Sequence, residues 1–273
     1  MPLTLISHLW NEAYLLPYWL RHHYPLFDHG VLLDYGSTDG SVEIARQLAP
    51  GWEVRPSRNE WFDAQLVDAE VMDVEREFGG WKLVLNTTEF VLCHDLPLYV
   101  RWMERYRPDV YGIWGYDLAA VDALGERDRE VTDLPLYFQK RWGYHPGGER
   151  SRLLHRRPDG QYGTGRHSSP VVGKVLDDGL FVVWFGWSPM RHVTGRKLQI
   201  QQRIPPRDRA ARQGWQHIVT PTELEARYQV EAAKAYDLWE RHPTYRELVG
   251  YLALRAGVVL EEAPGAQQPP AAP

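Results

Sequence analysis

The sequence has one cysteine and no long apolar segment, and both shortages limit what the protein can be. Cys93 is the single cysteine among 273 residues, so no disulfide can form within the chain. Because Cys93 lies in an apolar run, we expect a small core residue rather than a nucleophile. The apolar stretch LFVVWFGW at residues 180–187 is far shorter than the roughly 20 residues that span a bilayer. We therefore expect no transmembrane segment, which leaves peripheral membrane contact open.

Excess positive charge and a targeting signal are also missing. The net charge of −5 at pH 7 gives no reason to propose nucleic acid as a partner. The first residues, MPLTLISHLWNEAYLL, lack a basic start, and Asn11 and Glu12 interrupt the apolar run too early for a signal peptide. Together with the scarcity of cysteine, this favours a cytoplasmic protein. The 12 tryptophans and 15 tyrosines suit stacking on sugars or bases, although filling the core is the commoner role of such rings.

The first half of the chain alternates short apolar runs with amphipathic segments. We expect strands at 3–9, 30–36, 52–56 and 81–86, with helices inside 11–27, 37–49 and 63–78. Near-continuous apolar strands separated by helices are typical of a parallel sheet covered on both faces. The sequence therefore predicts an α/β fold with a mostly parallel central sheet and helices on both faces.

The second half of the chain has a looser pattern. We expect a helix at 96–106, strands at 109–118 and 180–187, and a loop-rich region between these strands. Two C-terminal helices are expected at about 221–241 and 243–256. The Pro- and Ala-rich tail, residues 261–273, should be disordered.

Polar residues gather where three of the predicted strands end. They are Ser7 and His8 with Asn11 and Glu12, then Asp34 with Ser37, Thr38 and Asp39, and then Asn86 to Glu89. In open parallel sheets, ligands bind outside the carboxyl ends of the strands, so these groups should line one crevice. Asp34 is suited to a nucleobase or a ribose hydroxyl, and Gly36 permits close backbone approach. Each group taken alone could instead be a capped turn, with Asn11, Ser37 or Asp39 as the cap.

Basic residues mark two later segments. In GRHSS, residues 165–169, Arg166 could pair with a phosphate and His167 with a phosphate or a metal, although most loop histidines are simply solvated. Residues 190–212 contain seven basic residues: Arg191, Arg196, Lys197, Arg203, Arg207, Arg209 and Arg212. Such a cluster suits a diphosphate, and the alternative is a solvated helix face that balances acidic neighbours.

The order and spacing of these motifs resemble glycosyltransferases of the GT-A fold, closest to the family 2-like and family 92-like group. The matching segments are NE, YWLRHH, DYGSTDGS, NTTEF, GTGRH and MRHVTGRKLQIQQR, spread over residues 3–205. The resemblance implies a Rossmann-like GT-A domain. Residues 1–118 would bind a nucleotide-sugar and residues 119–220 would form the acceptor side, followed by C-terminal helices at 221–260 and the tail at 261–273.

The resemblance also assigns roles to individual residues. The nucleotide-sugar, a UDP-sugar by expectation, would be bound by Asn11, Glu12, Asp34, Ser37, Asp39, Asn86, Thr88, Arg166 and Arg196. Asn86 and Thr88 stand where the family has two metal-binding aspartates, and Glu89 matches the glutamate that follows them. Mn²⁺ and Mg²⁺ prefer anionic oxygen ligands, so the family's ion should bind weakly here, through Glu89, His192 and His167, or not at all.

The implied reaction is sugar transfer from the nucleotide diphosphate to a hydroxyl of a glycan or lipid-linked acceptor. Asp117 and Asp133 are the candidates for the base that takes the acceptor proton. Trp114, Trp142 and Trp187 are candidates for stacking on sugar rings. A different class of function, favoured by the missing aspartates, is a non-catalytic descendant that binds carbohydrate or assists assembly. A nucleotidyltransferase would need a glycine-rich basic loop near the first strand, which SHLWNEAYLL lacks.

Overall fold

The computed structural model describes residues 1–125, 127, 130–171, 174–210 and 218–260. Within these ranges a single sheet contains ten strands. They are β1 (Leu3–Leu9), β2 (His29–Asp34), β3 (Glu53–Pro56), β4 (Trp81–Val84), β5 (Glu89–Leu92), β6 (Gly112–Val121), β7 (Trp142–Tyr144), β8 (Leu153–His155), β9 (Lys174–Trp187) and β10 (Tyr236–Asp237). The α-helices are α1 (Leu16–His23), α2 (Ser41–Leu48), α3 (Ala64–Glu75), α4 (Leu96–Tyr106), α5 (Leu136–Gln139), α6 (Met190–Gln202), α7 (Pro206–Ala210), α8 (Pro221–Lys234), α9 (Leu238–Arg241) and α10 (Pro243–Ala256).

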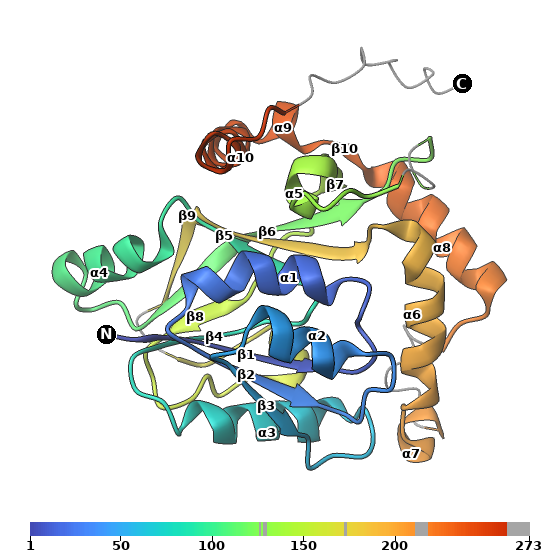
Figure 1. The fold of residues 1–273 in the computed structure, drawn as a ribbon, viewed down its shortest axis with the longest axis horizontal. Helices are drawn as coiled ribbons and strands as arrows, with labels where there is room; N and C mark the ends of the chain where they lie inside the picture. Colours follow the sequence, from blue (N-terminus) through green and yellow to red (C-terminus); the bar gives the residue numbers. More distant parts are fainter. Residues whose placement is uncertain (126, 128–129, 172–173, 211–217, 261–273) are drawn as a thin grey trace.

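The N-terminal half forms a parallel block in which β4, β1, β2 and β3 lie side by side in that order. Their carboxyl ends therefore meet at one edge, and α6 crosses that edge (Figure 1). The predicted fold class, an α/β protein with a mostly parallel central sheet and flanking helices, is confirmed. No helix in the described part of the chain is long and apolar enough to cross a membrane.

Side-chain alternation along the strands explains why helices cover both faces of this block. Leu5 of β1 packs with buried residues of α1 and α2, whereas the next residue, Ile6, packs with Val71 and Val74 of α3. Successive side chains of a strand point to opposite faces, so an apolar strand such as β1 needs a cover on each side. In Figure 1, α3 lies on the side of the sheet opposite to α1 and α2.

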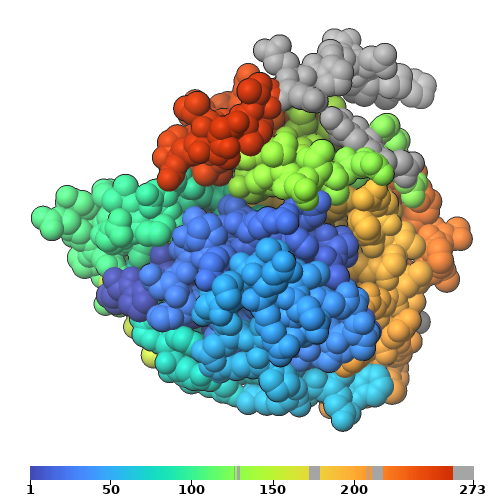
Figure 2. All heavy atoms as spheres, in the orientation of Figure 1, coloured from blue at the N-terminus to red at the C-terminus, as the bar shows by residue number. Residues whose placement is uncertain are grey.

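The C-terminal half extends the sheet with mixed strand directions. β6 runs parallel to β9 but antiparallel to β7 and β8, and β8 pairs antiparallel with β4. The boundary predicted between residues 118 and 119 falls inside β6, so both halves share one sheet. On the face seen in Figure 2, the side chains of α6 pack directly against those of the N-terminal half.

One predicted C-terminal helix is divided in the structure. The expected helix at 221–241 ends at Lys234, and the chain then forms β10, which pairs with β7, before α9 begins. Asp237 explains the break, because its carboxylate accepts the N–H groups of Trp239 and Glu240 and so caps a new helix. The predicted disordered tail, residues 261–273, lies outside the described residues.

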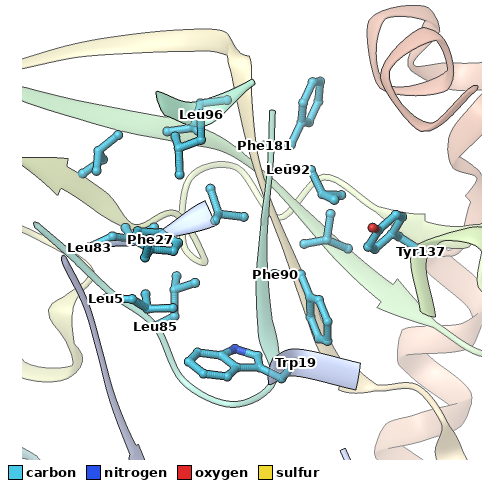
Figure 3. Close-up of a cluster of buried hydrophobic side chains, with 14 of the residues drawn as sticks. Leu5, Trp19, Phe27, Leu83, Leu85, Phe90, Leu92, Leu96, Tyr137 and Phe181 are labelled. Carbon is cyan, nitrogen blue, oxygen red and sulfur yellow. The ribbon is translucent and has the colours of Figure 1, made fainter. Parts of the chain in front are cut away.

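The turn between β4 and β5 redirects the chain at the centre of the sheet. The strand predicted to reach Asn86 ends at Val84, and the N–H of Glu89 donates to the carbonyl of Asn86 at 2.9 Å. β5 then leaves β4 and pairs antiparallel with β9. Trp19 of α1 is fully buried beside Phe90 (Figure 3), and its Nε1–H donates to the carbonyl of Glu89 at 2.8 Å. Core packing therefore fixes the position of Glu89.

Replacing Trp19 with Phe should destabilise the protein by roughly 1–3 kcal/mol, because the buried carbonyl of Glu89 loses its donor and the core loses volume. Urea unfolding followed by circular dichroism would measure the change. The matched control is Trp102→Phe, since Trp102 is 48% exposed and should change stability by less than about 0.5 kcal/mol. Equal effects of the two substitutions would contradict this role of Trp19.

Candidate functional site

A cavity of about 1070 Å³ opens at the carboxyl ends of the parallel strands. Its walls contain residues that directly follow β1, β2 and β4, together with the end of β9 and one side of α6 and α8. We call the part lined by His8, Trp10, Tyr35 and Phe62 the β2 end, and the part lined by Tyr144, Trp184, Trp187 and Glu231 the β9 end. The cavity thus lies where a parallel sheet commonly binds a ligand.

The β2 end is aromatic and contains a neutral histidine. The ring of His8 lies 5.9 Å from the rings of both Tyr35 and Phe62, measured between centroids. Burial, with the nearby charges of Arg166 and Arg196, lowers the pKa of His8 well below its usual value. Its buried Nδ1 has no hydrogen-bond partner among the residues that the structure describes. An unpartnered polar atom beside aromatic rings suits a planar, hydrogen-bonding ligand.

A buried ion pair forms the floor of the cavity between the two ends. Nε and Nη2 of Arg152 donate to the two carboxylate oxygens of Glu89 at 2.8 and 2.6 Å, and the side chains are 2% and 1% exposed. Asn86 adds its backbone N–H at 2.7 Å and its side-chain amide at 3.0 Å. Burial alone would raise the pKa of Glu89, but the attraction of Arg152 and these hydrogen bonds lower it overall. Glu89 is therefore a fully bonded carboxylate.

Arg152 also holds the loop at residues 165–167. Its Nη1 donates to the carbonyls of Gly165 and Arg166 at 3.1 and 3.3 Å, and to Nδ1 of His167 at 3.0 Å. Because a guanidinium can only donate, His167 accepts at Nδ1 and carries its proton on Nε2. Burial and the charge of Arg152 lower the pKa of His167 to about 4, which keeps this ring neutral at pH 7.

Two further arginines in the cavity wall are each paired with a buried carboxylate. Arg166 donates to Asp68 at 2.5 Å and to the side-chain oxygen of Asn86 at 2.6 Å. Arg196 of α6 donates to Glu12 at 2.8 Å. Arg166 has a φ of +63°, a left-handed backbone that few residues other than glycine adopt, so the tertiary contacts of its side chain hold a strained loop in place.

Lys197, the residue after Arg196, has a different environment. It is 7% exposed, and its Nζ lies 5.1 Å from the centroid of the Trp187 ring. Burial, followed by the charges of Arg196, Arg150 and Arg227, lowers the pKa of Lys197 to about 7. No ion pair joins Lys197 to a carboxylate in the described parts of the chain.

The structure brings together only some of the residues that the sequence singled out. Those that line the cavity are Glu12, Asn86, Thr88, Arg166, His167, Arg196 and Trp187. Trp114 and Trp142 do not line it. Glu89 lies beneath it, with both carboxylate oxygens bonded.

The remaining nucleotide-binding candidates bind one another instead of lining the cavity. Asp34 accepts the N–H of Gly36 and Ser37, and the hydroxyl of Ser37 accepts the N–H of Asn11 at 2.9 Å. Asn11 in turn accepts the N–H of Thr38 at 2.6 Å. Asp39 accepts the N–H of Ala13 at 2.9 Å. This network corresponds to the capped-turn alternative, and it positions the loops after β1 and β2.

The two candidate bases and the late histidine also lie outside the cavity wall. Asp117 is buried and accepts the N–H groups of Gly148 and Arg150 at 3.0 and 2.8 Å. The side chain of Asp133 is 99% exposed and lies 3.8 Å from that of Arg21. His192 stacks on Tyr14, with their ring centroids 4.5 Å apart.

The residues Asn86, Thr88 and Glu89 do not fit a divalent ion. No group of three or more His, Cys, Asp and Glu side chains that could hold a metal occurs within the described ranges. Asn86 and Thr88 are neutral, and the guanidinium of Arg152 already binds both oxygens of Glu89. A divalent cation at Glu89 would have to displace a buried arginine, which the low exposure of both side chains opposes.

Several residues of the cavity were not predicted as site residues. Trp10, Trp184, Arg150 and Arg152 belong to segments without a local motif, so spacing alone did not identify them. A useful signal is visible only in three dimensions, where the guanidinium of Arg150 lies 4.1 Å from the ring centroid of Trp184.

Comparison with known proteins gives only distant similarities. No protein-family model matches the chain, and no curated protein matches it. Among solved structures, S. aureus TarS (residues 1–349) is 9% identical over 72% of this chain and 66% of that one, with a TM-score of 0.39. The same protein in complex with UDP-GlcNAc is 13% identical over 48% and 37%, with a TM-score of 0.31.

A second similar protein is glucosyl-3-phosphoglycerate synthase from Mycobacterium tuberculosis in complex with Mn²⁺, UDP and glucosyl-3-phosphoglycerate. It is 16% identical over 57% of each chain, with a TM-score of 0.33. In all three comparisons this chain spans less than two thirds of the solved protein. Similarities this low leave the assignment of function to the residues of the cavity.

Replacing Arg152 with Met should destabilise the protein by roughly 3–5 kcal/mol at neutral pH, because it leaves the carboxylate of Glu89 buried without a partner. The pKa of Glu89 is lower in the folded protein than in the unfolded chain, so the ion pair stabilises the wild type at pH values above the pKa of an unfolded glutamate. This contribution is lost as the pH falls through the pKa of Glu89 in the folded protein. The difference in unfolding free energy between the wild type and the variant should therefore become smaller in acid. Urea unfolding at several pH values would measure it.

The exposed pair of Arg55 with Glu53 and Glu77 supplies a control for this prediction. Arg55→Met should lower the free energy of unfolding by less than about 1 kcal/mol. Adding Glu89→Gln to Arg152→Met should restore part of the lost stability. An Arg152→Met variant as stable as Arg55→Met at neutral pH would contradict the assignment.

Replacing Lys197 with Met should stabilise the protein by roughly 1–3 kcal/mol at pH 6, because the folded chain then no longer buries a charged ammonium. The pKa of Lys197 is about 7 when folded and near 10.5 when unfolded, so the unfolded state binds the extra proton between these values. The cost in folding stability of burying the charged Lys197 is therefore full below pH 7, and it declines as the pH rises towards 10. Thermal unfolding across this range should show the advantage of the variant shrinking, and a constant difference would contradict the shifted pKa.

Proposed function

We propose that this protein is a glycosyltransferase of the GT-A type that uses a nucleotide-diphosphate sugar, most simply a UDP-sugar, without a divalent cation. The observation that carries the proposal is the pairing of Arg152 with Glu89 beneath a cavity at the carboxyl ends of parallel strands. A guanidinium binds the carboxylate that would otherwise attract the ion. The cations that remain to meet a diphosphate are then side chains of this chain.

We expect the donor to bind with its base at the β2 end of the cavity and its sugar towards the β9 end. Its base and ribose would lie at the β2 end, against Tyr35 and Phe62, where Nδ1 of His8 can make a hydrogen bond. Its diphosphate would lie above Thr88, near Arg166, Arg196 and the Nε2–H of His167. Arg166 has a buried Nε with no hydrogen-bond partner in the described chain, so one of its donors is still available.

The reaction breaks the bond between the anomeric carbon and the diphosphate oxygen, and it forms a bond from that carbon to an acceptor oxygen. Negative charge grows on the diphosphate as this bond breaks. Arg166 and Arg196 are held in place by Asp68 and Glu12, so they can stabilise this charge without reorganisation. The sugar would lie towards the β9 end, where the rings of Trp184 and Trp187 offer apolar surfaces.

The acceptor proton needs a base at the β9 end. Glu231 of α8 lines this end, accepts the hydroxyl of Tyr144, and lies 3.0 Å from Lys234. Asp117 is committed to backbone N–H groups and Asp133 lies outside the cavity. Glu231 is therefore the carboxylate that we assign to this role.

A non-catalytic carbohydrate-binding protein is the second candidate, favoured by the neutral Asn86 and Thr88 at the family's metal position. The two candidates differ in turnover. A transferase should slowly hydrolyse a bound donor even without an acceptor, whereas a binding protein should release it intact.

Calorimetric titration with UDP and GDP, and with their sugars, tests the proposal. We expect one nucleotide to bind equally well with EDTA and with Mn²⁺, and its donor sugar to be hydrolysed. Arg196→Met should weaken binding roughly 10- to 100-fold, since a charge-assisted contact to phosphate is lost. Arg101→Met, an exposed change on α4, is the control of equal charge.

Three results would count against the account. Failure to bind any nucleotide would exclude the transferase, and binding without hydrolysis would favour the non-catalytic protein. A strong gain in affinity with Mn²⁺ that disappears in Glu89→Gln would exclude the metal-independent mechanism.

A further inference from the structure

Five of the positively charged residues that line the cavity differ in how their charge is balanced. Arg152, Arg166 and Arg196 each bind a buried carboxylate, so the protein itself neutralises them. Arg150 and Lys197 also line the cavity, but neither forms an ion pair with a carboxylate in the described part of the chain. At the β9 end, Arg150 and Lys197 therefore lack, within the described residues, the ion-pair partner that each of the three arginines has.

Arg150 and Lys197 come from separate segments of the chain and both line the β9 end. Arg150 lies in the loop between β7 and β8, and its guanidinium lies 4.1 Å from the ring centroid of Trp184. Lys197 is on α6, with its ammonium 5.1 Å from the ring centroid of Trp187. Both indoles come from the end of β9, so one strand brings the two cations together.

The indole rings do not offset the cost of this arrangement. A cation–π contact contributes about 0.5–2 kcal/mol, which is less than the several kcal/mol that an unpaired buried charge such as that of Lys197 costs. Arg150 is also close enough to Lys197 to help lower its pKa, together with Arg196 and Arg227. Glu231, which also lines the β9 end, offsets part of this effect on the pKa of Lys197 but forms no ion pair with it in the described chain. Two cations kept close together without an ion-pair partner suit the binding of an anionic ligand.

We propose that Arg150 and Lys197 bind an anionic group of the acceptor, a phosphate or a carboxylate, so that the acceptor is an anionic sugar or sugar phosphate. This assignment rests on the proposed function, because it treats the β9 end as the acceptor side. Trp184 and Trp187 would contact the acceptor's apolar faces, and Glu231 would lie near its reacting hydroxyl. Neutral glycans would lack the group that these two cations bind.

The donor diphosphate does not account for the two cations. Arg196 extends from α6 to Glu12, which follows β1, whereas Lys197 extends to Trp187 at the end of β9. Consecutive helical residues point about 100° apart, so α6 presents one cation to each part of the cavity. A donor whose base occupies the β2 end reaches Arg196 first.

The test is titration of inorganic phosphate into the full chain saturated with the nucleotide that it binds. We expect phosphate to bind, and both Arg150→Met and Lys197→Met to weaken that binding at least about 10-fold, with nucleotide affinity changed less than about threefold. Lys197→Arg, which keeps the charge, should retain most of the binding. Arg101→Met serves as the control, and thermal unfolding verifies that each variant is folded.

Two outcomes contradict the proposal, and a third separates it from the proposed function. A loss of nucleotide affinity in both variants would assign these cations to the donor diphosphate. Absence of phosphate binding to the nucleotide-saturated wild type would exclude an anion site at the β9 end. If no nucleotide binds, the proposed function fails, but phosphate binding to the free protein and its loss in both variants would still support an anion site.

Discussion

The ion pair between Glu89 and Arg152 is the interaction on which the rest of the site depends. It joins β5 to the loop at residues 165–167, because Arg152 binds the carboxylate with one side of its guanidinium and the loop with the other. The carbonyl of Glu89 accepts the indole N–H of Trp19, so the pair is also tied to the core. A buried pair of this kind is costly to break, since either partner alone would be an uncompensated charge. The ion pair therefore fixes Glu89 and Arg152 in place, and both oxygens of the Glu89 carboxylate are already bound by a guanidinium.

In the proposed reaction, the charged residues around this ion pair divide the cavity into a donor part and an acceptor part. Arginines held by carboxylates can stabilise a developing charge without moving, which suits a leaving diphosphate. Arg150 and Lys197 form no ion pair with a carboxylate in the described chain, and the burial of Lys197 lowers its pKa to about 7. In the proposed acceptor site, an anionic group of the ligand would supply the missing negative charge. On α6, Arg196 forms an ion pair with Glu12, whereas the neighbouring Lys197 is buried without such a pair in the described residues.

The sequence predicted the sheet and the location of the crevice because both follow from local patterns. Alternating apolar runs predicted parallel strands, and polar residues at their ends predicted the edge at which Glu12, Asn86 and Thr88 meet. Arg152 could not be found in this way, since 63 residues separate it from Glu89 and β8 is too short to show a period. Asp34 and Ser37 show the opposite case, in which a specific motif forms a turn and lies outside the cavity wall. Lys197 is one of seven basic residues in the segment 190–212, and among those that the structure describes its burial distinguishes it.

We propose above that arginine side chains, rather than a divalent ion, stabilise the diphosphate, while Arg152 occupies Glu89. This proposal is tested most directly by a crystal structure of the protein soaked with UDP and Mn²⁺, with diffraction data collected at the manganese absorption edge. We expect UDP in the cavity, Arg152 still bound to both oxygens of Glu89, and no anomalous peak beside them. A manganese peak coordinated by Glu89 and the diphosphate, with Arg152 displaced, would contradict the proposal.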